Sequence, residues 1–243
     1  MNCGSTAAIR FIWRGGPATT PLSGPVEDYL KVIYDLERVG EPAATNDIAT
    51  RLAISPASVS GMMRRLADQG LITHEPYRGV RLTHDGRHAA LRTLRRHRII
   101  ECYLTEVLGY PWDRVHAEAE RLEHAASEEL IERMATALGD PVQDPHGAPI
   151  PTRDGRVEEG TLRTLAEMGQ GDRLRVRRVQ DEDAGRLRYL AELGIRPGAL
   201  VRVLDRAPFD GPITLWVDDA GGGATRAVGV GLAEQVFVEP IAD

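Results

Sequence analysis

The sequence predicts an α+β fold that is mainly helical: an N-terminal winged helix-turn-helix, then a helical domain, then a small C-terminal β-barrel. Up to about residue 140, apolar residues recur at helical spacing, whereas residues 157–240 alternate in short segments punctuated by Gly and Pro. Charge is also segregated: residues 45–98 carry ten arginines and four acids, and residues 99–150 carry three arginines and eleven acids. A basic module beside an acidic one suggests a polyanion as one partner and a cation as the other.

Composition narrows the class of protein. The chain has 243 residues and 42% hydrophobic content, enough for one large domain or two to three small ones. Cys3 and Cys102 lack C-x-x-C spacing, which excludes a disulfide scaffold and a thiolate zinc site and favours a cytoplasmic location. No apolar run approaches membrane-spanning length, and residues 9–13 are too few for a signal-peptide core. We expect residues 1–24 to be a disordered extension, or the result of a translation start assigned too far upstream.

The winged helix-turn-helix is expected over residues 25–92. Pro25 lies in the first turn of a helix that continues to about residue 38. Thr45 opens a short helix, and after a turn a second helix, polar at its start and basic further along, ends at Gly70. Strand patterns at 72–76 and 79–83 follow, and a hairpin directly after such a helix is typical of a wing.

The next segment, residues 93–140, is expected to form a helical metal-binding and dimerisation domain. Helices are predicted over 86–107, 112–123 and 127–138. A Pro-rich linker over 141–156 should be extended. The barrel should occupy 157–243, with a short helix at 184–193 and a hairpin loop at 221–223.

The helical domain has an unusual pattern of carboxylates and imidazoles. Glu120, Glu123 and His124 stand at i, i+3 and i+4 and share one helical face, with His116 one turn earlier. On the preceding helix, His97 and Glu101 are four residues apart. Such side chains, converging from neighbouring helices, can form a cage for a divalent metal. The alternative is an ordinary solvated helix face.

The order of motifs resembles one known family over residues 25–240. The matching stretches are V-E-D-Y-L-K-V-I-Y, S-P-A-S-V-S-G-M-M-R-R-L, Y-R-G-V-R-L-T-H-D-G, R-R-H-R-I-I-E, V-H-A-E-A-E-R-L-E-H, P-H-G-A-P-I-P and P-F-D-G-P. They resemble the diphtheria-toxin-repressor family of metal-dependent transcriptional regulators, the manganese-responsive branch more than the iron-responsive one. The resemblance implies a C-terminal FeoA-like barrel and a homodimer that binds palindromic double-stranded operator DNA when loaded with metal.

The resemblance also implies a primary metal site. Its ligands fall on Asp28, His97, Glu120, Glu123 and His124. The iron-responsive branch has Met and Cys at the first and third of these positions, and oxygen in place of sulfur suits Mn(II) while still accepting Fe(II). The manganese branch can place a further Glu one turn after Asp28, where this chain has Lys31. Lys31 argues against a two-metal site completed from that helix. We expect one or two ions per subunit, because a second site elsewhere in the chain could hold another ion.

A second metal site is implied elsewhere in the chain. Its ligands map to Glu101, His116, Asp144 and His146, with Asp181 or Asp183 from the barrel. Asp144 stands where relatives have a thiol, which again exchanges sulfur for oxygen. The three aspartates are equally compatible with ordinary loop carboxylates.

For DNA contacts, the resemblance points to the two helices and the wing. The residues are Thr45, Ser55, Ser58, Ser60, Arg64, Arg65 and Arg78. Small hydroxyls mainly bond phosphates. Gly61 stands where some relatives carry a base-reading Gln, which leaves room for readout of DNA shape. Either Arg64 or Arg65 is equally compatible with a solvated helix charge.

The leading hypothesis is a DNA-binding regulator, expected to be a repressor, that senses Mn(II), or Fe(II), and controls metal homeostasis genes. One alternative is an iron-responsive regulator of the same family. Another is a winged-helix regulator of an organic ligand, which would not need five metal-type side chains on three helices. A dimetal carboxylate enzyme would need E-x-x-H on each of two helices; Glu123 stands where the His is required, so we expect no enzyme.

Overall fold

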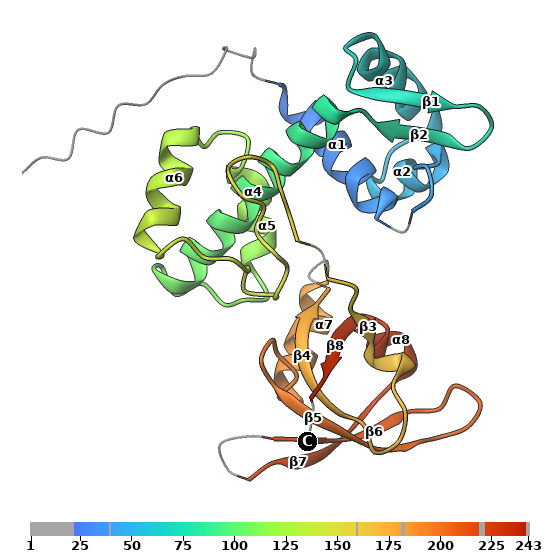
Figure 1. The fold of residues 1–243 in the computed structure, drawn as a ribbon, viewed down its shortest axis with the longest axis vertical. Helices are drawn as coiled ribbons and strands as arrows, with labels where there is room; N and C mark the ends of the chain where they lie inside the picture. Colours follow the sequence, from blue (N-terminus) through green and yellow to red (C-terminus); the bar gives the residue numbers. More distant parts are fainter. Residues whose placement is uncertain (1–21, 39, 159, 181–182, 219–221, 242–243) are drawn as a thin grey trace, which may run out of the picture.

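The computed structural model describes residues 22–38, 40–158, 160–180, 183–218 and 222–241. Almost all of the expected N-terminal extension therefore lies outside the described residues, as do Asp181 and residue 221 of the predicted hairpin loop. Figure 1 shows the mainly helical α+β arrangement that the sequence predicts, with most of the helices in the first 140 residues and a curled sheet, accompanied by two short helices, at the C-terminal end. In the part of the chain that is described, no helix is both long and apolar enough to cross a membrane.

The N-terminal part is a helix-turn-helix followed by a hairpin. Its helices are α1 (Gly24–Glu37), α2 (Thr45–Arg51) and α3 (Pro56–Asp68), and its strands are β1 (Ile72–Glu75) and β2 (Gly79–Leu82). Pro25 stands in the first turn of α1, and Ser55 caps α3 by accepting a hydrogen bond from the Ser58 amide. Strands β1 and β2 pair antiparallel, and α1, α2, α3 and the hairpin enclose one apolar core.

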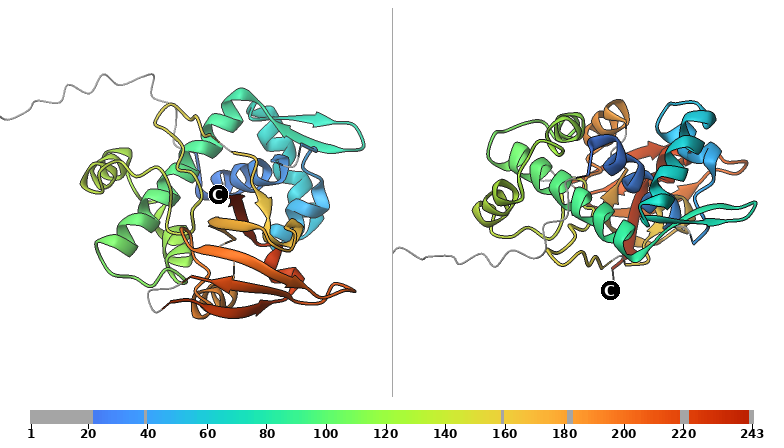
Figure 2. Two further views of the ribbon diagram at one scale, coloured as in Figure 1. Left: turned by 60° about the horizontal axis from the view of Figure 1, so that its bottom comes forward. Right: turned by 90° about the horizontal axis from the view of Figure 1, so that it is seen from above.

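Helix α4 (His84–Glu106) runs through two apolar cores. The Thr83 side chain caps it by accepting from the Gly86 amide. Leu91 and Leu94, in its first half, belong to the N-terminal core, and Ile99 belongs to the core of the helical domain. Helix α1 packs across α4 (Figure 2). Because α4 contributes residues to both cores, the two cores are joined by one continuous helix.

The helical domain is completed by α5 (Val115–Leu122) and α6 (Glu128–Ala137). Helix α5 is shorter than the predicted 112–123, because it begins at Val115 and Glu123 is its C-cap. Trp112 does not join this helix. Its side chain is buried in the core of the C-terminal domain instead.

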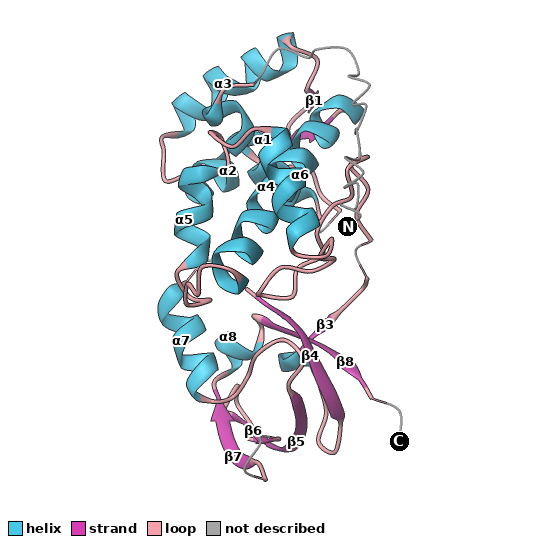
Figure 3. Cartoon of the chain, turned by 90° about the vertical axis from the view of Figure 1, so that its left-hand side faces the viewer, coloured by secondary structure: helices cyan, strands magenta, loops and turns pink. Residues whose placement is uncertain are grey.

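The C-terminal domain is a curled, antiparallel six-stranded sheet in the order β3-β8-β4-β5-β6-β7 (Figure 3). Alternate residues of β4 and β5, including Leu174, Val176, Val201 and Val203, point into its core, as period-two strands require. The strands are β3 (Arg163–Thr164), β4 (Arg173–Val179), β5 (Leu200–Arg206), β6 (Ile213–Val217), β7 (Ala224–Val228) and β8 (Val236–Pro240), with α7 (Ala184–Glu192), α8 (Val230–Ala233) and the 3-10 turn η1 (Leu165–Glu167).

The linker after α6 is held against the C-terminal domain. The Val179 amide of β4 donates to the His146 carbonyl at 2.9 Å. Gly147 has φ +87°, and a Cβ there would lie 1.9 Å from the Arg177 carbonyl oxygen, so only glycine allows this approach. The His146 ring also stacks on Trp112, with 5.6 Å between ring centroids. These contacts pack residues 146 and 147 of the linker against the C-terminal domain.

Candidate metal centre

The first group of candidate ligands lies where α1 meets the C-terminal end of α5. His124 Nε2 is 2.8 Å from Asp28 Oδ1 and 3.5 Å from Glu123 Oε1. One ligand atom from each of these residues lies within 4.8 Å of the others. Asp28 belongs to the helix-turn-helix part, whereas Glu123 and His124 belong to the helical domain, so the group spans two parts of the molecule.

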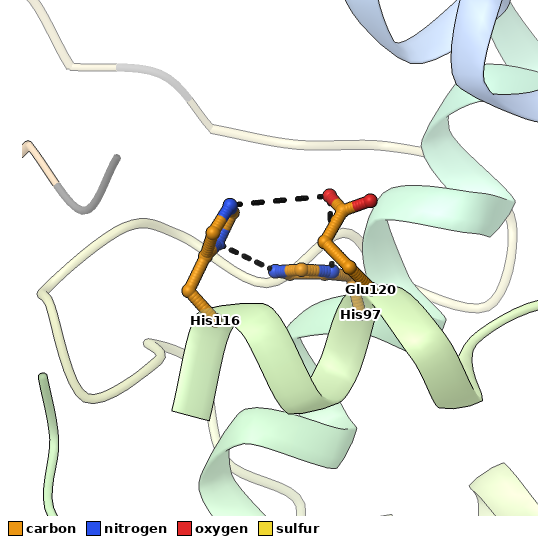
Figure 4. A group of neighbouring side chains, drawn as sticks. All are labelled: His97, His116 and Glu120. Atoms are coloured by element: carbon orange, nitrogen blue, oxygen red, sulfur yellow. Dashed lines mark hydrogen bonds and ion pairs between the residues drawn. The ribbon is translucent and has the colours of Figure 1, made fainter. Parts of the chain in front are cut away.

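The second group consists of His97 on α4 with His116 and Glu120 on α5 (Figure 4). His97 Nε2 is 3.1 Å from His116 Nδ1, and Glu120 Oε1 is 3.9 Å from both His97 Nδ1 and His116 Nε2. His97 Nδ1 also lies 2.5 Å from Glu123 Oε2. The structure thus brings together all five residues expected at the primary site.

The third group is Glu101, Asp144 and His146, and all three residues are buried. His97 Nε2, His116 Nδ1 and His146 Nδ1 lie 3.1, 3.4 and 3.9 Å from Glu101 Oε1. The other carboxylate oxygen, Glu101 Oε2, is buried and has no hydrogen-bond partner among the described residues. His146 Nε2 donates to the Trp112 carbonyl at 2.8 Å, so Nδ1 is the ring nitrogen that faces Glu101.

Asp183 does not join this third group. It is the N-cap of α7, where Oδ1 accepts hydrogen bonds from the Gly185 and Arg186 amides at 2.8 and 3.0 Å. These backbone bonds lower the pKa of Asp183. In this structure Asp183 thus lies at the start of α7, apart from Glu101, Asp144 and His146.

Two side chains near the first group were not expected as partners. Glu27 Oε2 lies 2.7 Å from His124 Nδ1, and Glu27 also pairs with Arg96 of α4. A carboxylate on Nδ1 holds the His124 ring so that Nε2 faces Asp28. Helical spacing could not reveal Glu27, because adjacent helix residues point about 100° apart. Lys31 lies between Glu120 and Glu123, with Nζ 2.6 Å and 2.8 Å from the respective carboxylates.

Opposing effects set the charges of these groups. Burial lowers the pKa of His97, but the Glu101 and Glu123 carboxylates more than offset it and raise the pKa to about 10. Burial raises the pKa of Glu101, yet His97 and His116 more than compensate and hold it below its ordinary value. For Asp28, burial prevails over the nearby His124 and Lys31, so its pKa is raised. His97 is thus an imidazolium between two carboxylates in the metal-free protein.

The donor atoms fit a divalent cation of hard or borderline character. All three groups offer carboxylate oxygen and imidazole nitrogen, and none includes sulfur. Cys102 is buried, its Sγ donates to the Gln143 carbonyl at 3.5 Å, and burial raises the pKa of its thiol. The clustered carboxylates, the unsatisfied Glu101 Oε2 and the Lys31 ammonium among them all indicate that positive charge is accommodated here.

The residues expected to contact DNA lie on α2, α3 and the wing. Val59, Met63 and Leu66 bury one face of α3, which leaves Ser58, Ser60, Arg64 and Arg65 exposed on the others. Thr45 is the first residue of α2 and is half-buried. Two of the seven also have structural roles: Ser55 caps α3, and Arg78 pairs with Glu41 and, at 3.6 Å, with Glu75.

A winged helix-turn-helix joined to clusters of carboxylates and imidazoles, one of them fully buried and two partly exposed, defines, as a class, a metal-dependent DNA-binding regulator. Known families match three consecutive parts of the chain: the iron dependent repressor N-terminal DNA binding domain over 21–80, the iron dependent repressor metal binding and dimerisation domain over 83–152, and the FeoA domain over 163–240. The chain belongs to the diphtheria-toxin-repressor family of iron-dependent repressors, and it is a DNA-binding regulator rather than an enzyme.

Individual relatives support this assignment. The iron-dependent repressor IdeR of Mycobacterium leprae (strain TN) is 36% identical over 190 residues, which cover 73% of this chain and 82% of that protein. The diphtheria toxin repressor of Corynebacterium diphtheriae is 32% identical over 199 residues, covering 78% and 87%. A solved structure of a manganese-dependent transcriptional repressor in complex with manganese is 42% identical, with a TM-score of 0.82 over 89% of this chain and 100% of the other. The predicted family, and the three-part fold that it implied, are confirmed.

Proposed function

We propose that this protein is a manganese-responsive repressor that binds palindromic operator DNA as a homodimer, with one or two Mn(II) ions per subunit. The ions would be held by the primary ligands Asp28, His97, Glu120, Glu123 and His124 and by the secondary ligands Glu101, His116, Asp144 and His146. Support comes from the donor set, since oxygen and nitrogen without sulfur suit Mn(II), which otherwise stands low in the divalent affinity series.

The observation that carries this proposal is the contact between Asp28 and His124. Its 2.8 Å hydrogen bond joins α1 of the helix-turn-helix part to the end of α5 in the helical domain. A bound divalent cation would supply two positive charges to the carboxylates that meet here. Asp28 then couples the orientation of the winged helix to the binding of metal by the helical domain. The metal needs to bind one orientation more tightly than the other by only a few kcal/mol to switch the protein between them.

The DNA-binding part of the proposal rests on α3 and the wing. The exposed hydroxyls and arginines of α3 are suited to phosphates and base edges, as in other recognition helices. The match to a dimerisation domain over residues 83–152 supports a homodimer. Exposed apolar side chains of the helical domain, such as Leu108, Leu122 and Leu130, provide surface for it. Because a two-fold dimer presents two equivalent helices, its operator should be palindromic.

The test begins with selection of binding sequences from a random duplex pool in the presence of Mn(II). Fluorescence anisotropy on the selected duplex then compares Mn(II), anaerobic Fe(II), Mg(II) and chelator. We expect tight binding with Mn(II), loss of binding with chelator, and a steep decrease of affinity with salt. Equal affinity with and without chelator would contradict the metal-sensing function. Activation by Fe(II) at lower concentration than Mn(II) would instead support the iron-responsive alternative.

A further inference from the structure

Lys31 is the sole lysine of the chain, which otherwise uses arginine for every basic side chain apart from histidine. It stands on α1, three residues after Asp28, so the two side chains leave the same side of the helix. Its side chain is only 12% exposed. The only lysine ammonium of the chain is therefore placed at the junction of α1 and α5.

The Lys31 ammonium contacts two carboxylates that belong to the proposed metal site. Nζ is 2.6 Å from Glu120 Oε1 and 2.8 Å from Glu123 Oε1. Burial lowers the pKa of Lys31, but Glu123 and Glu120 more than offset it and raise the pKa above its ordinary value. A full positive charge thus lies between two oxygen donors that a divalent cation would also need.

Lysine is well suited to a contact that must be broken again. An ammonium is a compact point charge on a flexible stem, whereas a guanidinium would hold a carboxylate through two parallel hydrogen bonds. Lys31 also lines a cavity of about 900 Å³, together with Asp35 of α1 and Gln180 after β4. The cavity provides space into which the side chain can turn without crossing the apolar core.

We propose that Lys31 is a tethered cation that competes with the incoming divalent ion for Glu120 and Glu123, and so raises the metal concentration at which the primary site fills. This inference rests on the proposed function, because it requires that the cluster binds a divalent metal. The ammonium keeps the carboxylates neutralised in the metal-free protein. Like-charge repulsion then requires it to leave when a divalent cation arrives.

The sole lysine makes this exchange directly observable. In full-length protein labelled with [13C]lysine, the Lys31 side chain gives the only lysine signals, which are titrated with diamagnetic Cd(II). We expect the ε-methylene signal to move from a shifted, ion-paired position to that of a solvated lysine, in step with ion uptake measured by calorimetry. An unmoved Lys31 signal during stoichiometric ion uptake would overturn the inference and leave the proposed function intact. Absence of any ion uptake would instead refute the proposed function.

Calorimetric titration of Mn(II) into variants provides a second, independent measurement. Lys31→Met keeps the length of the side chain but removes its charge, and we expect about tenfold tighter Mn(II) binding, the scale of removing one close like charge. Arg121→Met is the matched control, since Arg121 lies on α5, is exposed and pairs with Glu118 rather than with a proposed ligand. It should leave the affinity unchanged. Equal Mn(II) affinity in Lys31→Met and the wild type would overturn the competition. A Lys31→Met protein that does not fold without metal leaves the lysine-signal titration of the wild type as the deciding measurement.

Discussion

At the scale of single residues, His97 connects the three candidate ligand groups. Its Nδ1 reaches Glu123 and its Nε2 reaches Glu101 and His116, so one imidazolium neutralises carboxylates on both sides. The pKa of His97 is about 10 in the folded protein and 6.5 in an unfolded chain. Its charge therefore stabilises the metal-free fold at neutral pH.

This raised pKa predicts how stability depends on pH. A folded pKa above the unfolded value gives a contribution that is complete below pH 6.5 and is lost as pH rises through about 10. We expect metal-free protein to lose on the order of 5 kcal/mol across that window through His97. Urea denaturation in chelator at several pH values measures this loss. His97→Gln should show a much flatter profile, and an equally steep profile in the variant would assign the pH dependence to other groups.

Asp28 is predicted to separate metal binding from DNA binding. In Asp28→Ala the other four primary ligands remain, so Mn(II) should still bind to the helical domain in calorimetry. The gain in operator affinity on metal addition should decrease to less than about fivefold, because α1 loses the one side chain by which it would bind the metal in this proposal. Anisotropy on the selected duplex measures this gain. An unchanged metal response would show that Asp28 is only a helix-dipole partner near the start of α1.

At the scale of secondary-structure elements, two helical glycines have opposite environments. Gly61 lies in α3, and a Cβ added there would meet nothing within 4 Å. Gly86 lies in the first turn of α4, where a Cβ would be 1.9 Å from the Leu71 carbonyl oxygen. Helix propensity favours alanine at both positions, so the difference between them isolates the effect of packing.

We therefore expect Gly61→Ala to stabilise the protein by about 0.5–1 kcal/mol. Gly86→Ala should destabilise it by about 2 kcal/mol or more, because the Leu71 backbone would have to move. Thermal unfolding of both variants beside the wild type measures the two changes. Similar effects in both variants would mean that the close approach of α4 to residue 71 is not maintained in solution.

The helices and strands were largely predictable from local signals. Pro25, the Thr45 start and Gly70 mark helix ends that depend only on neighbouring residues, and the sheet follows from period-two alternation. The start of α5 was not predictable, because Trp112 packs into a core more than fifty residues further along the chain. Element ends that depend on long-range packing leave no periodic trace in the sequence.

The candidate site was predictable in its residue types but not in its contacts. The spacing of His97 with Glu101, and of Glu120 with Glu123 and His124, placed these side chains on helix faces, and the structure brings them together. The partners that orient and neutralise them come from another helix. Neither the support of His124 by Glu27 nor the position of Lys31 between two carboxylates follows from spacing, because both depend on how α1 crosses α5.

At the scale of the whole molecule, side chains from the helical domain pack into the C-terminal domain and pair with its residues. Trp112 comes from the loop before α5, yet it is buried among residues of the sheet domain, and Asp113 pairs with Arg188 at 2.9 Å. The Trp112 carbonyl also accepts from His146, a residue of the third ligand group. The C-terminal domain therefore supports the group formed by Glu101, Asp144 and His146.

We expect Trp112→Ala to destabilise the C-terminal domain by about 3 kcal/mol, the range for a large core side chain. Faster hydrogen exchange in β4 and a weaker second Mn(II) binding step should accompany this loss, because the His146 ring loses its stacking partner. The primary Mn(II) step should be unaffected. Exchange measured by mass spectrometry and calorimetry together test these outcomes. If only the primary Mn(II) step were weakened, the C-terminal domain would support the primary ligands and not the group formed by Glu101, Asp144 and His146.

Because α4 is long, a small tilt near its middle produces a larger displacement at its N-terminal end. Its 23 residues extend about 34 Å, and His97 lies about 20 Å from the first residue, His84. A tilt of about 5° around His97 would move that first turn, and the hairpin attached to it, by roughly 2 Å. In a two-fold dimer both arms move, so their separation would change by roughly 3–4 Å, close to the 3.4 Å rise of one base-pair step. A small rearrangement at His97 would thus be sufficient to bring the two helix-turn-helix modules of a dimer into or out of register with the DNA double helix.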